Sequence, residues 1–477
     1  MNFRTFLLLL TLGLTFSNCQ SSKADKAPVY EAALITINGQ ITNPSASQQN
    51  FVENIYGSES LEVKHGKFTI QIPSSHPTVL TAYLGNNRLE VYARPGDRIL
   101  VSFDEKDFEN TLAIDGPTTT ENEILKQYAQ LQTEGIGNFM SNFQLSEADF
   151  VTKMENVQST GLAFINEAVK QYPEVDKEFI QFLKDYNSLS GGSLVGNYET
   201  YHKYMVPQDA DYIPSDTFNI FFKKMAKMTP YRPGIPQYIE LHKSQKMALA
   251  QKKIMADSSL MTPEGFNLAK AQVLEENYKD PQLKELMTFD NLYEHMQMDG
   301  TVDIEEDYQG FIAKASDDAL KMRLKSKHEE WAHLQKGKPA PGFTFPDQDQ
   351  LSHSLADYKG KVVYIDVWAT WCGPCIAEQP YLAEIEAEYA GNNDIVFMGV
   401  SIDDEKGMWL NAVTQKEMSG VQLFSEGGFN SEINQKYNII GIPRFILIDK
   451  EGNLVDATAA RPSSAGIRGQ LAGLVEE

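Results

Sequence analysis

The sequence of 477 residues predicts a multidomain chain in which a β-sandwich is followed by an all-α helical region and then by an α/β domain. Three observations predict this order. Short alternating strands separated by turns occupy residues 29–116, helical spacing of apolar residues dominates residues 117–335, and buried strands alternate with helices in residues 336–477. The usual size of a domain also predicts about three domains for this length.

The beginning of the chain has the pattern of a secretion signal. Arg4 precedes an apolar run over residues 6–16, which is too short to span a bilayer but suits the core of a signal peptide. A cysteine directly after such a run resembles the lipobox of bacterial lipoproteins, which implies removal of residues 1–18 and acylation of Cys19. The alternative is a secreted protein with a spare thiol. Residues 19–28 are polar and predict a short tether.

Residues 29–116 have the pattern of short strands. An apolar run over residues 33–37 meets Asn38-Gly39, a strong hairpin turn signal, and residues 68–72 alternate apolar with polar side chains. This pattern predicts a small antiparallel β-sandwich. It contains no obvious catalytic group, so we expect a spacer or a docking surface.

Residues 117–335 have helical spacing of apolar side chains. Asp280-Pro281 places a capping residue before a proline that suits the first turn of a helix. Stripes of aromatic side chains in this region are expected to form core rather than a peptide groove, and its histidines lack the spacing of metal ligands. Two roles stay open for the helices: they can shape access to the thiols described below, or they can mediate dimerisation.

The charge of the chain excludes some partners. The formal net charge is −23, from 42 basic and 65 acidic residues. Binding of nucleic acid or of anionic lipid headgroups requires a basic face, so neither is expected as a partner. The acidic excess is interpreted as a contribution to solubility.

A buried strand passes into a helix through two cysteines near the C-terminal third of the chain. Residues 361–368 are β-branched and aromatic, and Cys372-Gly-Pro-Cys375 follows at once. Beyond Pro380, apolar residues recur at helical spacing. Cys372 is therefore expected at a helix N-terminus, where backbone N–H groups and the helix dipole favour a thiolate. Cys375 lies one turn further on, close enough to bond to it.

Three chemical roles are open to this cysteine pair. Zinc needs two further ligands, and the chain has no second cysteine pair and no histidine motif to supply them. A structural disulfide closing a two-residue loop would constrain the unfolded chain only a little. Redox chemistry is the role that remains, and we expect neither a metal nor a cofactor.

The block Trp371-Cys372-Gly373-Pro374-Cys375 at the end of a hydrophobic strand resembles the active site of the thioredoxin fold. This copy is similar to the TlpA/ResA-like thiol–disulfide oxidoreductases of the bacterial envelope. The resemblance covers the last third of the chain, and it implies a thioredoxin fold for residues 336–477. More weakly, residues 29–116 resemble the β-domain found ahead of such domains in envelope lipoproteins.

The redox interpretation assigns a role to each cysteine. Cys372 is the nucleophile that forms a mixed disulfide with a partner, and Cys375 then attacks Cys372 to release the reduced partner. Gly373-Pro374 is the pair found in reducing thioredoxins, with a potential of about −270 mV against about −120 mV for a strong oxidant. We therefore expect a reductant.

Further site residues are expected around the cysteines. Asp366 lies within an apolar strand, so burial should raise its pKa and fit it to handle the proton of Cys375, unless it faces solvent from a strand edge. It also matches the buried aspartate of thioredoxins. The resemblance implies an acid near the disulfide at Glu378, for which the alternative is an exposed helix position. It also implies a cis-proline at Pro443, with Ile442 and Trp371 contacting the substrate.

These observations predict an envelope thiol–disulfide oxidoreductase that reduces protein disulfides. The resemblance implies a periplasm-facing lipoprotein of a Gram-negative bacterium, anchored through Cys19. It also implies a membrane electron donor of the CcdA/DsbD kind and clients that include apocytochromes, as in cytochrome c maturation, with an antioxidant role as a further possibility. The alternative is an envelope binding or assembly lipoprotein whose β and helical domains recruit a partner, with redox activity secondary.

Overall fold

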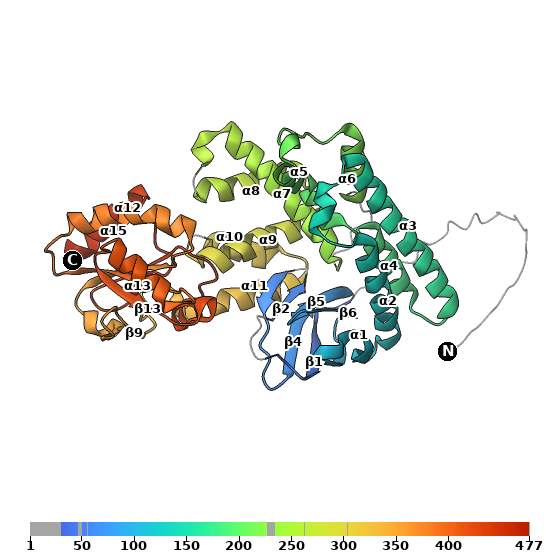
Figure 1. Ribbon diagram of the computed structural model, residues 1–477, viewed down its shortest axis with the longest axis horizontal. Helices are drawn as coiled ribbons and strands as arrows, with labels where there is room; N and C mark the ends of the chain where they lie inside the picture. The colour runs from blue at the N-terminus through green and yellow to red at the C-terminus, as the bar shows by residue number, and fades with distance from the viewer. Residues whose placement is uncertain are drawn as a thin grey trace, which may run out of the picture.

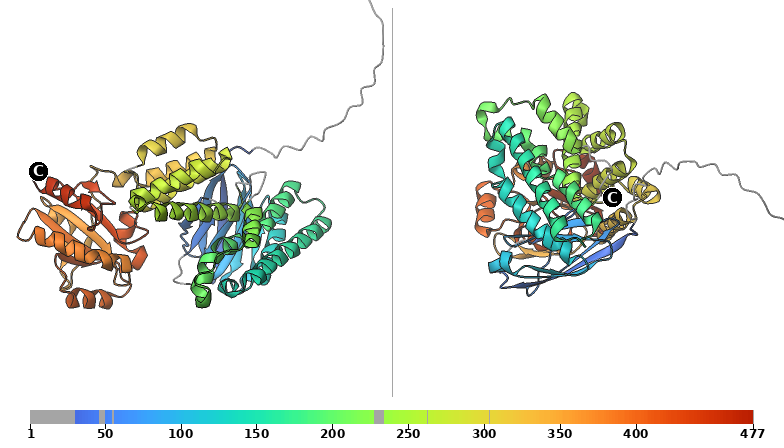
Figure 2. Two further views of the ribbon diagram at one scale, coloured as in Figure 1. Left: turned by 90° about the horizontal axis from the view of Figure 1, so that it is seen from above. Right: turned by 90° about the vertical axis from the view of Figure 1, so that its right-hand side faces the viewer.

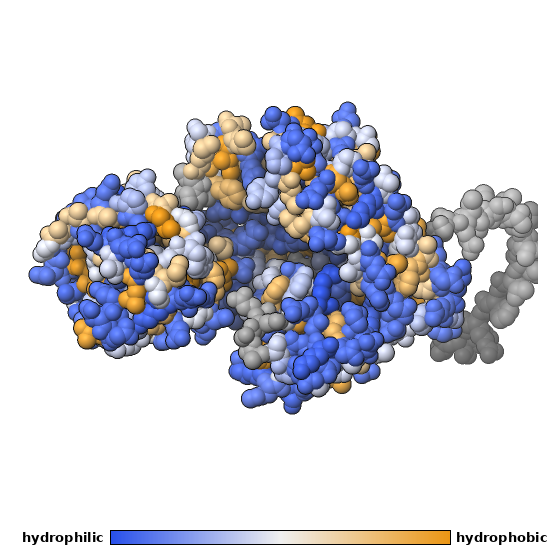
Figure 3. Space-filling view, viewed as in Figure 1, coloured by the Kyte–Doolittle hydropathy of each residue, from blue (hydrophilic) through white to orange (hydrophobic). Residues whose placement is uncertain are grey.

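The structure is a computed structural model that describes residues 30–45, 50–54, 56–226, 234–261, 263–302 and 304–476. The expected signal peptide (residues 1–18), the tether (residues 19–28) and Cys19 lie outside the described residues. Figure 1 shows sheets and helices packed together over the N-terminal two thirds of the chain and a separate C-terminal lobe at one end, and the space-filling view in Figure 3 shows the same lobe as a distinct body. Within the described ranges, no helix combines the length and the apolar character needed to cross a membrane.

Two four-stranded sheets form the N-terminal region. The first has the order β4-β1-β7-β8, and its strands are β1 (Ala33–Thr42), β4 (Lys67–Ser74), β7 (Arg98–Asp104) and β8 (Ala113–Asp115). The second has the order β3-β2-β5-β6, and its strands are β2 (Phe51–Asn54), β3 (Gly57–Ser60), β5 (Thr78–Leu84) and β6 (Asn87–Ala93). The pairs are antiparallel except β1 with β7, which is parallel, so the expectation of a purely antiparallel sandwich is wrong at that pair.

The hairpin turn expected at Asn38-Gly39 is also wrong, because β1 continues straight through both residues. Gly39 pairs with Phe68 of β4, and a Cβ at Gly39 would lie 2.0 Å from the Phe68 ring. The glycine therefore makes room for the aromatic ring on the neighbouring strand and does not form a turn. Only the cross-strand partner distinguishes these two uses of Asn-Gly.

The helical region follows the sheets. Its helices are α1 (Phe108–Thr111), α2 (Thr119–Ile136), α3 (Glu147–Gln171), α4 (Lys177–Ser188), α5 (Gly192–Met205), α6 (Asp216–Ala226), α7 (Pro236–Ala256), α8 (Pro263–Asn277), α9 (Pro281–Asp299), α10 (Glu305–Lys314) and α11 (Asp318–Glu330). The start predicted at Asp280-Pro281 is confirmed, because the Asp280 carboxylate accepts a hydrogen bond from the Leu283 N–H at the N-terminus of α9.

The sheets and these helices share one hydrophobic core. Buried residues of β1 and β5, such as Ile35 and Val79, belong to the same cluster as Phe150 of α3 and Met287 of α9. The Tyr92 ring of β6 packs edge-on against Phe179 of α4 at 4.8 Å between centroids. The helices therefore cover apolar surface of the sheets and are stabilised by the same burial of apolar area.

The C-terminal lobe has a separate core. Its five-stranded sheet has the order β13-β12-β11-β14-β15, with β11 (Val362–Trp368) in the centre. β11 is parallel to β12 and antiparallel to β14, as expected for the thioredoxin fold. The other elements are β9 (Thr344–Pro346), β10 (Ser352–Ser354), β12 (Ile395–Ser401), β13 (Val421–Phe424), β14 (Arg444–Ile448), β15 (Leu454–Asp456), α12 (Gly373–Glu388), α13 (Lys406–Gln415), α14 (Glu432–Lys436) and α15 (Ala465–Glu476).

Successive side chains of β11 point to opposite faces of this sheet. Val363, Ile365 and Val367 share a cluster with residues of α13 and α14. Val362 and Tyr364 share the other cluster with residues of α12 and α15. The alternation therefore places Asp366, two residues beyond Tyr364, on the face covered by α12.

Candidate functional site

The two cysteines lie where the central strand β11 passes into α12. Cys372 is the N-cap of α12, and the Cys375 N–H donates to Cys372 Sγ at 3.1 Å. The two sulfurs form a disulfide, with 5.3 Å between the Cα atoms, and both residues are buried. In the reduced protein the same N–H and the helix dipole are positioned to stabilise a thiolate on Cys372.

Asp366 is buried on the central strand and not at a sheet edge, with 3% of its surface exposed. Burial, with the nearby charges of Glu378 and Glu386, raises the pKa of the Asp366 carboxyl to about 8. Among the described residues, its Oδ1 atom has no hydrogen-bond partner. A carboxyl with these properties can take up or release a proton near neutral pH.

Glu378 lies in the second turn of α12 and is buried, so it is not an exposed helix position. Its two carboxylate oxygens accept hydrogen bonds from Ser463, one from the backbone N–H at 3.0 Å and one from the hydroxyl at 2.9 Å. Ser463 precedes α15, so this carboxylate ties the cysteine-bearing helix to the C-terminal helix. It also acts electrostatically on Asp366.

The bond between Ile442 and Pro443 is cis. Arg444, the next residue, begins β14 and pairs with Val367 of β11. This register puts Ile442-Pro443 beside the end of β11 from which the cysteine loop leaves. Trp371 in that loop has 53% of its surface exposed, and its ring lies 5.8 Å from the ring of Phe429.

Asp403 is a site residue that the sequence reasoning missed. It is buried just beyond β12, and its carboxylate accepts hydrogen bonds from the Thr370 N–H at 3.0 and 3.1 Å and from the Thr370 hydroxyl at 2.6 Å. The Ser401 hydroxyl donates to the same carboxylate at 2.7 Å. Asp403 therefore fixes the loop that carries Cys372. The acid after the buried strand at residues 395–402 was the available signal.

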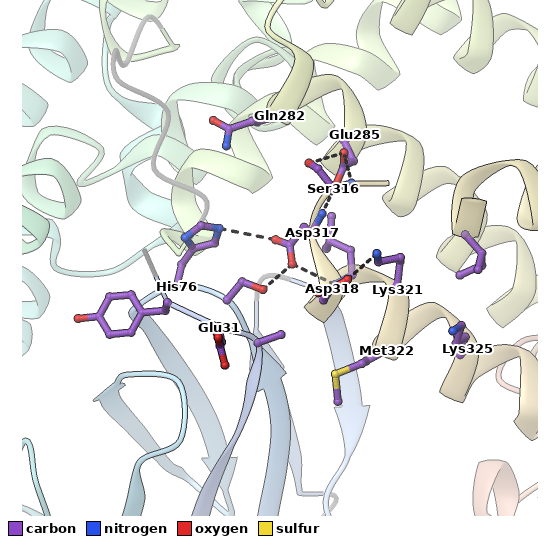
Figure 4. Close-up of a pocket in the computed structure, with 15 residues that line it drawn as sticks. Glu31, His76, Gln282, Glu285, Ser316, Asp317, Asp318, Lys321, Met322 and Lys325 are labelled. Atoms are coloured by element: carbon purple, nitrogen blue, oxygen red, sulfur yellow. Dashed lines mark hydrogen bonds and ion pairs between the residues drawn. The ribbon is translucent and has the colours of Figure 1, made fainter. Parts of the chain in front are cut away.

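A cavity of about 800 Å³ lies away from the cysteines, between the N-terminal sheets and α9–α11 (Figure 4). Asp317 in its wall accepts a hydrogen bond from the Ser75 hydroxyl at 2.6 Å and lies 3.6 Å from His76. Asp317 also caps α11 by accepting from the Ala319 N–H, and Glu285 accepts from the Ser316 and Asp317 N–H groups. These carboxylates accept hydrogen bonds from backbone N–H groups at the start of α11. This capping role is sufficient to explain why acidic side chains lie in the cavity wall.

Comparison with known proteins locates similarity in the C-terminal part. A profile of the Redoxin family matches residues 335–466. The thiol-disulfide oxidoreductase ResA of Bacillus cereus is 32% identical over 130 residues, which are 27% of this chain and 71% of that protein. The thioredoxin-like protein YneN of Bacillus subtilis is 28% identical over 124 residues, 26% of this chain and 71% of that protein. The solved thioredoxin domain of a thiol-disulfide oxidoreductase from Bacteroides vulgatus is 29% identical, covers 30% of this chain and 99% of that chain, and superposes with a TM-score of 0.28.

Proposed function

The chain belongs to the ResA-like thiol–disulfide oxidoreductases of the thioredoxin superfamily, and on this premise we propose that it reduces disulfide bonds of client proteins through Cys372 and Cys375. The observation that carries this proposal is the cysteine pair at the N-terminus of α12, with the buried Asp366 on the strand behind it.

The reaction transfers two electrons from the dithiol to the client. The Cys372 thiolate attacks one sulfur of the client disulfide, and the other client sulfur leaves as a thiolate and takes up a proton. Cys375 gives its proton to the Asp366 carboxylate and attacks Cys372 Sγ. The second client sulfur leaves as a thiolate and takes up a proton, and the Cys372–Cys375 disulfide, the form in this structure, is left.

The remaining site residues shape this exchange. Glu378 keeps the pKa of Asp366 high through its negative charge and holds α12 through Ser463. Trp371, Ile442 and Pro443 contact the client, which binds as an extended segment beside its disulfide. Gly373-Pro374 sets a reducing potential, so the protein acts as a reductant. A membrane donor of the CcdA/DsbD kind then reduces the Cys372–Cys375 disulfide back to the dithiol.

The proposed location is the periplasmic side of the envelope of a Gram-negative bacterium. Residues 1–18 act as a signal peptide, Cys19 is acylated, and residues 19–28 form the tether. The chain then comprises a β-sandwich (residues 29–116) and a helical domain (residues 117–335), which share one hydrophobic core, and the thioredoxin-like domain (residues 336–477). Apocytochromes are the clients that we propose first.

Reduction of insulin disulfides by dithiothreitol in the presence of the purified chain tests the activity. We expect Cys372→Ser to abolish acceleration. In a separate incubation without dithiothreitol, the reduced Cys375→Ser variant should accumulate a mixed disulfide with insulin, which added dithiothreitol then cleaves. The proposal fails if the wild-type chain does not accelerate insulin reduction under conditions in which thioredoxin does. Complementation of a deletion strain by the double Cys→Ser variant would favour the binding or assembly role.

A further inference from the structure

The loop that contains the cis-proline is in contact with a helix from outside the C-terminal lobe. A Cβ at Gly441 would lie 3.3 Å from Met298 Cε, so the methyl group of Met298 packs directly over Gly441. Met298 lies in the last turn of α9, and 46% of its surface is still exposed. A side chain from the helical region thus contacts Gly441, which lies two positions before Pro443 in the sequence.

Arg444, the residue directly after Pro443, fixes this contact. It is buried, and its Nη2 group donates a hydrogen bond to the Met298 carbonyl. Its guanidinium also lies over the Trp331 ring, 5.9 Å from the centroid. The Thr458 hydroxyl donates to the neighbouring Asp299 carbonyl at 2.9 Å.

These two carbonyl groups belong to the end of α9. The last four carbonyls of an α-helix have no partner within the helix and carry a partial negative charge. A cationic donor at Met298 O and a hydroxyl donor at Asp299 O therefore satisfy groups that would otherwise need water. The C-terminal lobe caps α9 from outside, with the side chain adjacent to the cis-proline.

The part of α9 before Met298, as far as Met296, is held in a different core. Leu286, Met287 and Phe289 are buried in the cluster shared by the N-terminal sheets and the helices. The helix runs from that core to the C-terminal lobe, as Figures 1 and 2 show. After it, Gly300 at φ +77° lets the chain turn beneath Trp331, where a Cβ would lie 3.0 Å from the indole ring. The position of Met298 is therefore fixed from both sides.

We propose that Met298 extends the client-binding surface beyond the C-terminal lobe and selects clients with an apolar extended segment beside the disulfide. This inference rests on the proposed function. Exposed apolar side chains come from the cysteine loop (Trp371, 53% exposed), from the segment before the cis-proline (Ile440, 49%) and from α9 (Met298). Met298 packs over Gly441, next to Ile440, and the pairing of Arg444 with Val367 places this segment beside the strand end from which the cysteine loop leaves. A methionine adapts to different apolar shapes. Arg444 is the positioning residue that holds Met298 in place.

Two disulfide probes of different size test this proposal on the full chain. Insulin is a protein substrate that reaches past the cysteines, whereas bis(2-hydroxyethyl) disulfide is a small uncharged disulfide with no extended segment beside its sulfurs. We expect Met298→Glu to raise the KM for insulin about tenfold with kcat unchanged, because a carboxylate then faces the apolar segment. The rate with the small disulfide should not change. Met255→Glu, at an 81% exposed methionine of α7, is the matched control and should alter neither rate.

Arg444 is tested by the same pair of probes. Arg444→Met should raise the KM for insulin and leave the small disulfide unaffected, and Arg444→Lys should restore part of the insulin KM because it keeps a cationic donor. An unchanged insulin KM for Met298→Glu, or an equal loss with both probes, overturns the inference. Failure of the wild-type chain to reduce either probe would instead remove the proposed function itself.

Discussion

The carboxylate of Asp403, beyond β12, accepts hydrogen bonds from both the backbone N–H and the hydroxyl of Thr370, two residues before Cys372. The loop that carries Cys372 is thus held from the neighbouring strand. Removing the carboxylate leaves the Thr370 N–H without its acceptor. This is costly because Asp403 is buried.

We expect Asp403→Ala to lower the free energy of unfolding of the C-terminal lobe by about 2–4 kcal/mol, because several hydrogen bonds to a charged acceptor are lost. All four tryptophans of the chain lie between residues 331 and 409, so tryptophan fluorescence during urea unfolding reports on this lobe. Asp404→Ala, at the exposed neighbouring position, is the control and should change stability little. Equal stability of the Asp403 variant and wild type would contradict the assigned role.

Asp366→Asn tests the raised pKa of the buried carboxyl. With a pKa of about 8 in the folded protein and near 4 in the unfolded chain, the folded state binds more protons between these values. The contribution of this carboxyl to the free energy of unfolding should therefore fall as the pH rises from about 4 to 8, by about 1 kcal/mol per pH unit, and level off above 8. The Asn variant should lack this slope, whereas Asp394→Asn at an exposed site should keep it.

The same variant should change the kinetics of exchange. If Asp366 accepts the Cys375 proton, resolution of the mixed disulfide accelerates as the pH rises through about 8, where the carboxyl ionises. Stopped-flow measurement with insulin should find this acceleration in wild type, whereas in Asp366→Asn the rate should rise only at higher pH, where the Cys375 thiol ionises without help from the carboxyl. A shared pH profile would exclude Asp366 from the proton transfer.

Glu378→Gln separates the electrostatic role of Glu378 from its structural one. The amide keeps an oxygen that can accept from Ser463 but loses the negative charge, which is the second cause of the raised Asp366 pKa after burial. We expect the pKa of Asp366 to fall below about 8 in a ¹³C NMR titration of its carboxyl. Glu384→Gln, at an exposed position of the same helix, should leave it in place.

The helical region contains a buried charge cluster that sets its stability. Lys246 is 0% exposed and contacts Asp290 at 2.6 Å, and Lys243 contacts the same carboxylate at 2.9 Å. Asp290→Ala should lower the free energy of unfolding by about 3–5 kcal/mol, because it leaves a buried lysine without its counter-charge. Urea unfolding followed by far-UV circular dichroism measures this. Asp307→Ala, at an exposed acid of α10, should have little effect.

The sequence predicted local structure well where one segment decides it. The apolar run before Cys372 forms β11, and the start of α9 at Asp280-Pro281 is where it was expected. Asn38-Gly39 shows the opposite case, since a turn signal was overridden by the packing of Phe68 from another strand. Turn propensity depends only on neighbouring residues. It therefore does not include the ring of Phe68, which is 29 positions from Gly39 in the sequence (68 minus 39).

The sequence by itself determined that two thiols lie at the junction of a strand and a helix, because hydrophobic periodicity and the Cys-Gly-Pro-Cys spacing are properties of adjacent residues. Only the tertiary structure decided that Asp403 holds the cysteine loop and that Arg444 joins the cis-proline to Met298. Those contacts join residues far apart in the chain, and they depend on strand order, on register and on where α9 ends. The residue pattern along one segment does not specify the order of the strands, their register or the position at which α9 ends.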